Sequence, residues 1–365
     1  MVENLSFIRN RHKPLCTSPY GLVTYHSNSI YLYSENEFHR IVKIQRGLKY
    51  KIASLFRITE RILRKEPKYA LFADNVLFVA MSNAILEINI ETKTIIKTHK
   101  YREDGIHTSR LSYISHIEGF QDCVAYGEYF DNPRREEVCI YTRELGSKEF
   151  SRKFQFPPHK IRHIHTLIPD KINNCVYIFT GDSDSESGIW KATNDFKNIE
   201  PILVGNQDYR ACIGFSEKDY IVFATDIPSR KNGIYSLNLK TKEVTLIKII
   251  SGSCTTGCNI GDKIFFGSTV ESKEPSGTGF FNRLRYLFRR KRAAGIIDDF
   301  ARLYCGSVKD GFEEILRYRK DFYPAGLCQF GRINVVPYAE QGKIYVFPQA
   351  LKKVDAKLGY FSIKE

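Results

Sequence analysis

The chain has 365 residues, of which 42% are hydrophobic and 26% are charged, and this composition excludes an intrinsically disordered protein. Lysine and arginine number 55 against 41 acidic residues, so the net charge is +14. Such a charge favours polyanionic partners: nucleic acid, an anionic membrane surface or an acidic polysaccharide. No stretch approaches the roughly 18 uncharged apolar residues that a transmembrane helix needs.

Strand-like segments recur along the chain and are rich in tyrosine and phenylalanine, which favour β-structure. Segment 89–93 (Asn-Ile-Glu-Thr-Lys) matches segment 238–242 (Asn-Leu-Lys-Thr-Lys), and each lies between two such strands, as in an outer hairpin. All-β repeats of about 40–50 residues are typical of β-propellers. We therefore predict an all-β fold: a single β-propeller domain over residues 1–365, with seven blades, or six if the chain ends share a blade.

Two segments interrupt the β pattern. Segment 43–66 carries apolar residues at helical spacing and basic residues between them. We expect a helix whose apolar face packs on the propeller rim, and the alternative is an interfacial helix on an anionic bilayer. Segment 272–300 is a basic insertion in the sixth blade. Its residues 280–292 alternate aromatic residues with arginine, which fits either an interfacial helix on an anionic bilayer or another rim helix. The candidate membrane-binding residues are Phe281, Arg285, Leu287, Phe288, Arg289 and Arg290.

Five apolar runs align as the second strands of successive blades: 77–81, 124–128, 177–182, 221–226 and 264–268. Three of them end in a carboxylate, namely Glu128, Asp182 and Asp226. Equivalent strand ends of a propeller open on one face, so we expect these three acids to converge there. They are the candidate general acid, general base or nucleophile.

The first strands begin with residues of complementary chemistry. His163 and His165 flank Ile164 and should point the same way in a strand, which suits proton transfer or hydroxyl binding. The candidate substrate-binding residues are Arg110, Arg162, Arg210 and Tyr129, because arginines suit a carboxylate or phosphate on a ligand. The alternative is that all these residues form structural hydrogen bonds and salt bridges between blades.

We expect no cofactor and assign no metal ligands. One alternative stays open, because a His-x-His pair on a strand with a nearby acid binds zinc or manganese in other proteins. His163 and His165 would then be the ligands of a divalent metal. The nine cysteines lie in strand-like segments, and we expect reduced, buried thiols.

Four segments of the chain resemble a group of bacterial proteins. They are 127–129 (Gly-Glu-Tyr), 162–165 (Arg-His-Ile-His), 180–182 (Thr-Gly-Asp) and 225–228 (Thr-Asp-Ile-Pro). These segments are similar to sialidase-like β-propellers of the BNR, or Asp-box, type, which are associated with surface-polysaccharide gene clusters. The resemblance spans roughly residues 105–270 and implies a propeller that acts on carbohydrate.

Together these observations predict a carbohydrate-active propeller that acts on an anionic saccharide in bacterial surface-polysaccharide metabolism, as a glycoside hydrolase, lyase or transferase. The alternative is a non-catalytic glycan-binding or scaffold propeller docked on a membrane-bound polysaccharide assembly. We expect an acidic oligosaccharide or polysaccharide as partner and an anionic membrane as a second one. Nucleic acid is disfavoured, because no RNP, KH or zinc-finger motif occurs. With no signal-peptide pattern at the start, we expect a cytoplasmic location, peripheral on the inner membrane if the membrane-docked alternative holds.

Overall fold

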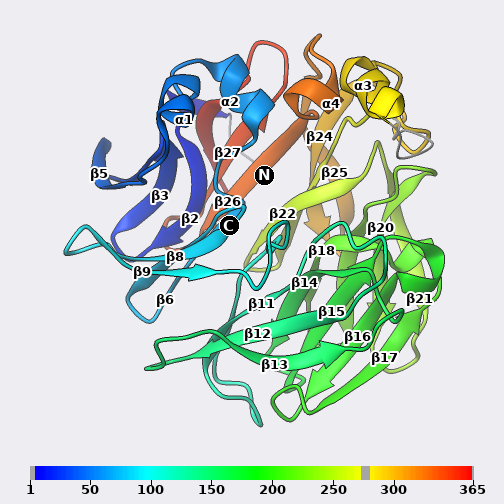
Figure 1. The fold of residues 1–365 in the computed structure, drawn as a ribbon. Helices are drawn as coiled ribbons and strands as arrows, with labels where there is room; N and C mark the ends of the chain where they lie inside the picture. The colour runs from blue at the N-terminus through cyan, green and yellow to red at the C-terminus, as the bar shows by residue number, and fades with distance from the viewer. Residues whose placement is uncertain (1–4, 273–279, 364–365) are drawn as a thin grey trace. The chain divides into compact units, whose positions relative to one another are not determined.

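The computed structural model describes residues 5–272 and 280–363. Its strands form seven four-stranded sheets, each built from neighbouring antiparallel hairpins, and this confirms the predicted seven-bladed β-propeller (Figure 1). Contacts divide the chain into two compact units. Unit 1 comprises Met1–Glu66, Asp226–Ile234 and Leu246–Glu365, and unit 2 comprises Pro67–Thr225 and Tyr235–Thr245.

Unit 1 contains three complete sheets. The first has strands β2 (Lys13–Ser18), β3 (Gly21–His26), β4 (Ser29–Ser34) and β5 (Glu37–Lys43). The sixth has β22 (Cys254–Ile260), β23 (Lys263–Ser268), β24 (Phe300–Ser307) and β25 (Gly311–Arg319). The seventh has β26 (Arg332–Tyr338), β27 (Lys343–Gln349), β28 (Lys357–Ser362) and β1 (Ser6–Asn10). Because β1 pairs with β28, strands from the two ends of the chain share the seventh sheet.

Unit 2 also contains three complete sheets. The second sheet has β6 (Tyr69–Ala73), β7 (Val76–Ala80), β8 (Ala84–Asn89) and β9 (Thr94–Lys100). The third has β10 (Ser112–Ile114), β11 (Cys123–Gly127), β12 (Val138–Glu144) and β13 (Ser151–Phe156). The fourth has β14 (His163–Asp170), β15 (Cys175–Gly181), β16 (Gly188–Thr193) and β17 (Asn198–Val204). The fifth sheet has residues in both units: β18 (Ala211–Ser216), β19 (Tyr220–Thr225), β20 (Asn232–Asn238) and β21 (Val244–Ile250).

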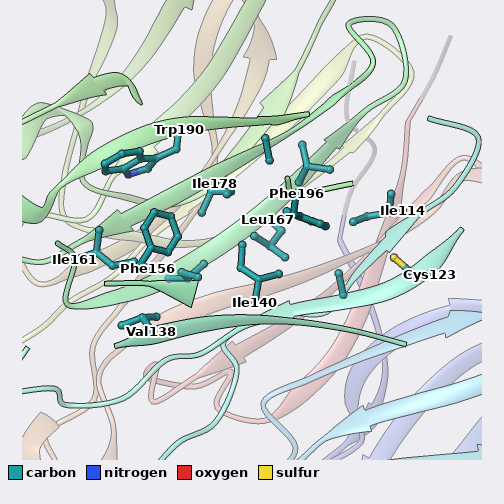
Figure 2. Close-up of a cluster of buried hydrophobic side chains, with 14 of the residues drawn as sticks. Ile114, Cys123, Val138, Ile140, Phe156, Ile161, Leu167, Ile178, Trp190 and Phe196 are labelled. Carbon is teal, nitrogen blue, oxygen red and sulfur yellow. The ribbon is translucent and has the colours of Figure 1, made fainter. Parts of the chain in front are cut away.

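Burial is greatest in the inner strands of a blade and least in the outermost strand. In the fourth blade every residue of β15 is buried, whereas most of β17 is partly or fully exposed. Strands that are apolar on both faces are buried on both faces, so side chains of neighbouring blades interdigitate. Between the third and fourth blades the core includes Ile140, Phe156, Ile178 and Trp190 (Figure 2). This core fixes the first strand of the fourth blade, β14.

The two matching segments of the sequence are outer hairpins, as predicted. Segment 89–93 joins β8 to β9, and segment 238–242 joins β20 to β21. The Asn89 Oδ1 accepts a hydrogen bond from the Thr92 amide at 2.8 Å, and the Asn238 Oδ1 accepts one from the Thr241 amide at 2.9 Å. An asparagine that bonds the backbone two or three residues ahead favours a turn, which explains why the same residue recurs there.

The interruption at 43–66 is helical, as predicted, with α1 (Leu48–Ala53) and α2 (Arg57–Leu63). The expected packing of its apolar face on the rim is wrong. Leu48 is 72% exposed and Phe56 is 62% exposed, whereas Glu60 and Arg61 are buried. The charged side chains turn inward because they find partners there, and the apolar side chains are left outside.

The basic insertion contains α3 (Phe280–Phe288), and the short helix α4 (Ala325–Cys328) contacts both α2 and α3. Among residues 5–272 and 280–363, no helix is both long enough and apolar enough to cross a bilayer.

Candidate functional site

Two histidines enter the site from the first strand of the fourth blade. His163 opens β14 opposite Gly181, the last residue of β15. The register shifts between Ile164 and Thr166, so His165 is the extra residue of a β-bulge. A bulge re-aims a side chain locally. Here both imidazoles reach the same point, as the sequence predicts, with 3.0 Å between their Nε2 atoms.

Asp182, which directly follows β15, completes a compact cluster with these two histidines. Its Oδ1 lies 3.2 Å from the His165 Nε2 and 3.4 Å from the His163 Nε2. The His163 and His165 side chains are 3% and 0% exposed, whereas the Asp182 side chain is 18% exposed. The cluster is therefore closed around the histidines and reached from solvent on the carboxylate side.

The other ring nitrogen of each histidine faces a backbone carbonyl. The His163 Nδ1 lies 2.9 Å from the Phe130 oxygen, and the His165 Nδ1 lies 3.0 Å from the Ala211 oxygen. A carbonyl oxygen can only accept a hydrogen bond, so both Nδ1 atoms donate. In the neutral imidazoles the two Nε2 atoms then present lone pairs to each other and to the carboxylate.

Two arginines flank Asp182. The Arg162 Nη1 lies 3.3 Å from the Asp182 Oδ2, and the Arg210 Nη2 lies 3.1 Å from the Oδ1. Arg210 and Gln207 also donate to the Asp182 backbone oxygen, at 3.2 and 2.6 Å. Arg162 forms a further ion pair with Asp131, whose side chain is 80% exposed. The Asp182 carboxylate and its backbone oxygen are thus held from several sides.

The electrostatics of the cluster follow from burial and from these neighbours. Burial alone would raise the pKa of the Asp182 carboxyl. An imidazole that takes up a second proton, on Nε2, donates to this carboxylate, and such bonding with His163 and His165 outweighs burial and holds the pKa of Asp182 below its usual range. Burial lowers the pKa of His163, and Asp182 opposes only part of that shift. The site therefore combines an ionised carboxylate with a His163 that resists protonation.

Aromatic stacking fixes the His163 ring. Tyr129 stacks on His163 with 4.0 Å between ring centroids, and it stacks on His107 on its other side at 5.2 Å. Burial lowers the pKa of His107 to about 4, so this outer ring is neutral near pH 7. Tyr129, predicted as a substrate-binding residue, lies beside the cluster and supports it.

Gly181 gives the His165 ring its space. A Cβ added at this position would lie 2.5 Å from the His165 Cε1 and 3.0 Å from its Nε2. Real Cβ contacts are longer, so any other residue here would displace the ring. The glycine that precedes Asp182 is a structural requirement of the site.

Glu128, one of the three predicted catalytic acids, directs its carboxylate away from this cluster. Glu128 is buried, and its carboxylate accepts bonds from the Arg102 Nε at 2.7 Å and the Cys139 amide at 2.8 Å. Burial raises its pKa, although Arg102 opposes the shift. Asp226, the third predicted acid, is buried as well.

Two of the three predicted arginines lie at the cluster, and the third makes its contact elsewhere. Arg162 and Arg210 contact Asp182, whereas the Arg110 guanidinium lies over the Tyr69 ring at 5.3 Å. Sequence patterns missed Gln207, which begins a three-residue 3-10 helix, and Asp131, which lies in a loop, because no periodic pattern marks either position.

The predicted membrane-binding residues of the insertion lie in and just after α3. Phe288 is 61% exposed, Arg285 and Arg290 are exposed, and Leu287 and Arg289 are half-buried. Phe281 lies within α3, but its side chain is outside the described part of the structure.

Comparisons with known proteins define the class and go no further. The chain matches no protein family and no curated protein. Its structure is similar to the WD40 propeller of Doa1, with 9% identity and a TM-score of 0.56, covering 100% of this chain and 96% of that one. It is also similar to the Dos1 propeller, with 10% identity and a TM-score of 0.53, covering 93% and 75%.

A third similar structure is the extracellular domain of BT4673 from B. thetaiotaomicron, with 11% identity and a TM-score of 0.56, covering 98% of this chain and 39% of that one. At these identities the likeness shows the fold alone. The protein is a β-propeller, and the sialidase-like type stays a prediction.

Proposed function

We propose that the protein recognises an anionic saccharide at the cluster of His163, His165, Asp182, Arg162 and Arg210. The observation that carries this proposal is that two arginines flank the half-buried Asp182 carboxylate, on the side of the cluster that solvent reaches. The guanidinium fork matches a carboxylate geometrically, so arginines at the open side of the cluster suit an acidic sugar. The resemblance to carbohydrate-active propellers supports the same substrate class.

Arg162 is the arginine best placed to meet a ligand. Its second partner, Asp131, is exposed, and an exposed ion pair contributes little stability. A ligand carboxylate can replace Asp131 at little cost and leave the bond to Asp182 intact. Arg210 is more firmly held, because it bonds both the side chain and the backbone of Asp182.

The test is calorimetric titration of the protein with uronic-acid oligosaccharides and with their neutral counterparts. We expect binding of the acidic series only, and at least a tenfold loss of affinity in Arg162→Gln. Arg152→Gln is the matched control, since Arg152 is an exposed arginine of the same unit that bonds Gln155 at 2.8 Å. Equal binding of neutral and acidic sugars, or equal losses in both variants, would overturn the proposal.

The same saccharides distinguish an enzyme from a non-catalytic binding protein. Chromatography of the saccharide after incubation shows whether it is cleaved. Asp182 contacts both histidines, whereas Arg102 and the Cys139 amide already occupy Glu128. Asp182→Asn should therefore abolish any turnover, and Glu128→Gln should act through stability rather than through the chemical step.

A second function, docking on an anionic membrane, is favoured by the reversed packing of α1 and α2. These helices leave six large apolar side chains exposed: Leu48, Ile52, Leu55, Phe56, Ile62 and Leu63. The two acids of segment 44–66, Glu60 and Glu66, are both buried. What faces water is therefore apolar and basic, the combination that binds anionic bilayers.

The helices of unit 1 form one continuous surface, which we call the helical face: α1, α2, α4 and α3 (Figure 1). The Arg61 Nε donates to the Cys328 oxygen at 2.8 Å, which ties α2 to α4. Phe322, just before α4, is 69% exposed, and Leu284 and Phe288 of α3 are exposed as well. Segment 280–292 contains no acid, so the basic character extends along the whole face.

Co-sedimentation with vesicles tests this second function. We expect binding to vesicles of phosphatidylserine and phosphatidylcholine, weaker binding to pure phosphatidylcholine, and loss at high salt. The double variant Leu55→Ser/Phe56→Ser should release the protein. Ile172→Ser, which removes an exposed apolar side chain from unit 2, should bind like the parent. Binding that ignores lipid charge and the double variant would overturn the proposal.

A further inference from the structure

We propose that the His163 Nε2, the His165 Nε2 and the Asp182 Oδ1 bind a divalent transition-metal ion of the zinc type. This inference rests on the proposed function, because it assigns a cofactor to the same cluster. It replaces the expectation, drawn from the sequence, of a site without one. Among the described residues, these three side chains form the group whose ligand atoms lie close enough together to share an ion.

The first argument is the direction of the lone pairs. Both Nδ1 atoms donate to backbone carbonyls, so each neutral imidazole presents an unprotonated Nε2 to the centre of the cluster. The Asp182 Oδ1 points to the same centre. Three electron-pair donors around one point repel each other unless a cation lies between them. A metal ion satisfies all three at once.

The second argument is spacing. Ligands at about 2.1 Å from an ion are about 3.0 Å apart in an octahedral site and about 3.4 Å apart in a tetrahedral one. The three separations here are 3.0, 3.2 and 3.4 Å. The site is thus already shaped for a first-row ion, and little rearrangement is needed on binding.

The third argument is the support around the ligands. Histidines that bind metals usually donate their other ring nitrogen to a carbonyl or carboxylate, and ligand carboxylates are themselves hydrogen-bonded. Phe130 and Ala211 supply the carbonyls, and Arg162 and Arg210 hold the carboxylate. Tyr129 fixes the plane of the His163 ring by stacking.

The arginines reduce the charge that Asp182 offers to the ion, and they also determine what else binds. Three protein ligands leave a fourth position, as in catalytic zinc sites. Solvent reaches the cluster on the carboxylate side, where the arginines lie. The fourth ligand would therefore be anionic, and a sugar carboxylate held by Arg162 fits it.

The experiment is metal titration of the full-length chain after chelator treatment. Calorimetry with Zn²⁺ should give one equivalent per chain, and Co²⁺ should give the visible absorption of a protein-bound, low-coordinate ion. Losing even an outer partner of a metal site typically weakens binding about 10–100-fold, so Asp182→Asn and His163→Ala should weaken it by about 100-fold or more. His159→Ala, which removes an exposed histidine, should bind like the parent.

Asp182→Asn keeps the shape of the side chain, so it remains informative if His163→Ala fails to fold. The proposal would be overturned if the folded parent bound less than one equivalent of Zn²⁺. It would also be overturned if Asp182→Asn bound Zn²⁺ as tightly as the parent. Saccharide binding by the chelated protein would count against the metal and leave the proposed function intact. Metal binding without any saccharide binding would support the metal site and count against the proposed function.

Discussion

Two regions of this propeller bury charged or polar side chains in different ways. In unit 1, the buried side of α2 carries charged residues that form ion pairs with each other and with nearby residues. Arg57 lies 3.3 Å from Glu60, 3.0 Å from Glu66 and 3.0 Å from Asp355. In unit 2, the centre of the cluster brings two imidazole lone pairs against a carboxylate.

The difference between these regions teaches how to separate structure from function. A buried network whose charges pair with each other needs no bound ligand, and it holds α2 against the rest of unit 1. The second region has three electron-pair donors that converge on one point, where we propose that a metal ion binds. The first should respond to mutation through stability, and the second through ligand binding.

The largest expected effect is in the matched network. Glu66 is buried and pairs with the buried Lys13 and the half-buried Arg57, so Glu66→Gln removes one ion-pair partner from each of these cations. Breaking a buried pair in this way typically costs about 3–5 kcal/mol. Urea unfolding should show a loss of this size in Glu66→Gln, and Glu313→Gln, at an exposed position, should change little. A small loss of unfolding free energy in Glu66→Gln would mean that the ion pairs of Glu66 do not stabilise the fold.

Acid should weaken the same network. Burial raises the pKa values of Glu66 and Asp355, but Lys13 and Arg57 for Glu66, and Arg57 and Arg61 for Asp355, hold both pKa values below their usual range. A carboxyl with a depressed pKa stabilises the fold above its unfolded pKa, near 4, and this stability is lost as pH falls through the folded value. Each group contributes about 1.4 kcal/mol per pH unit in that window.

Unfolding free energies between pH 6 and pH 3 should therefore fall with acid in the parent and fall less steeply in Glu66→Gln. Parallel curves for the two proteins would show that Glu66 does not titrate differently in the folded and unfolded states.

A glycine substitution tests the cluster of unit 2. In Gly181→Ala the new Cβ meets the His165 ring at 2.5 Å, and forced overpacking typically costs about 1–3 kcal/mol. Zn²⁺ affinity should fall along with stability, because the displaced ring loses its alignment. Gly47→Ala is the control, since its Cβ meets nothing within 4 Å. If Gly181→Ala is destabilised but its Zn²⁺ affinity is unchanged, metal binding does not depend on the position of the His165 ring.

The sequence predicts the two regions unequally. Strand repeats and the hairpin asparagines Asn89 and Asn238 define the blades, because hydrophobic period and turn chemistry are local. His163 and His165 come together as predicted, although a β-bulge at His165, which the sequence does not mark, sets the direction of the second ring. Glu128 does not join them, because its carboxylate direction depends on Arg102, which lies 26 residues earlier in the chain. No periodic pattern records such pairings.

The same reasoning explains why the packing of α1 and α2 was predicted in reverse. Helical periodicity shows that apolar and charged residues occupy opposite faces, but not which face is covered. The choice depends on distant partners such as Asp355, 298 residues from Arg57, and Asp321, 260 residues from Arg61. Once those acids are in place, the charged face turns inward.

The smallest effect on stability is expected on the helical face. Leu55 and Phe56 are each 62% exposed, so serine there should change the free energy of unfolding by no more than about 0.5 kcal/mol per site. Phe78 is fully buried, and Phe78→Ala should cost about 3–5 kcal/mol in the same urea titration. If Leu55→Ser/Phe56→Ser is instead strongly destabilising, the two side chains are packed in solution and the helical face is not free to dock. If stability is unchanged and vesicle binding is lost, these exposed apolar residues serve an interaction, because the fold does not need them.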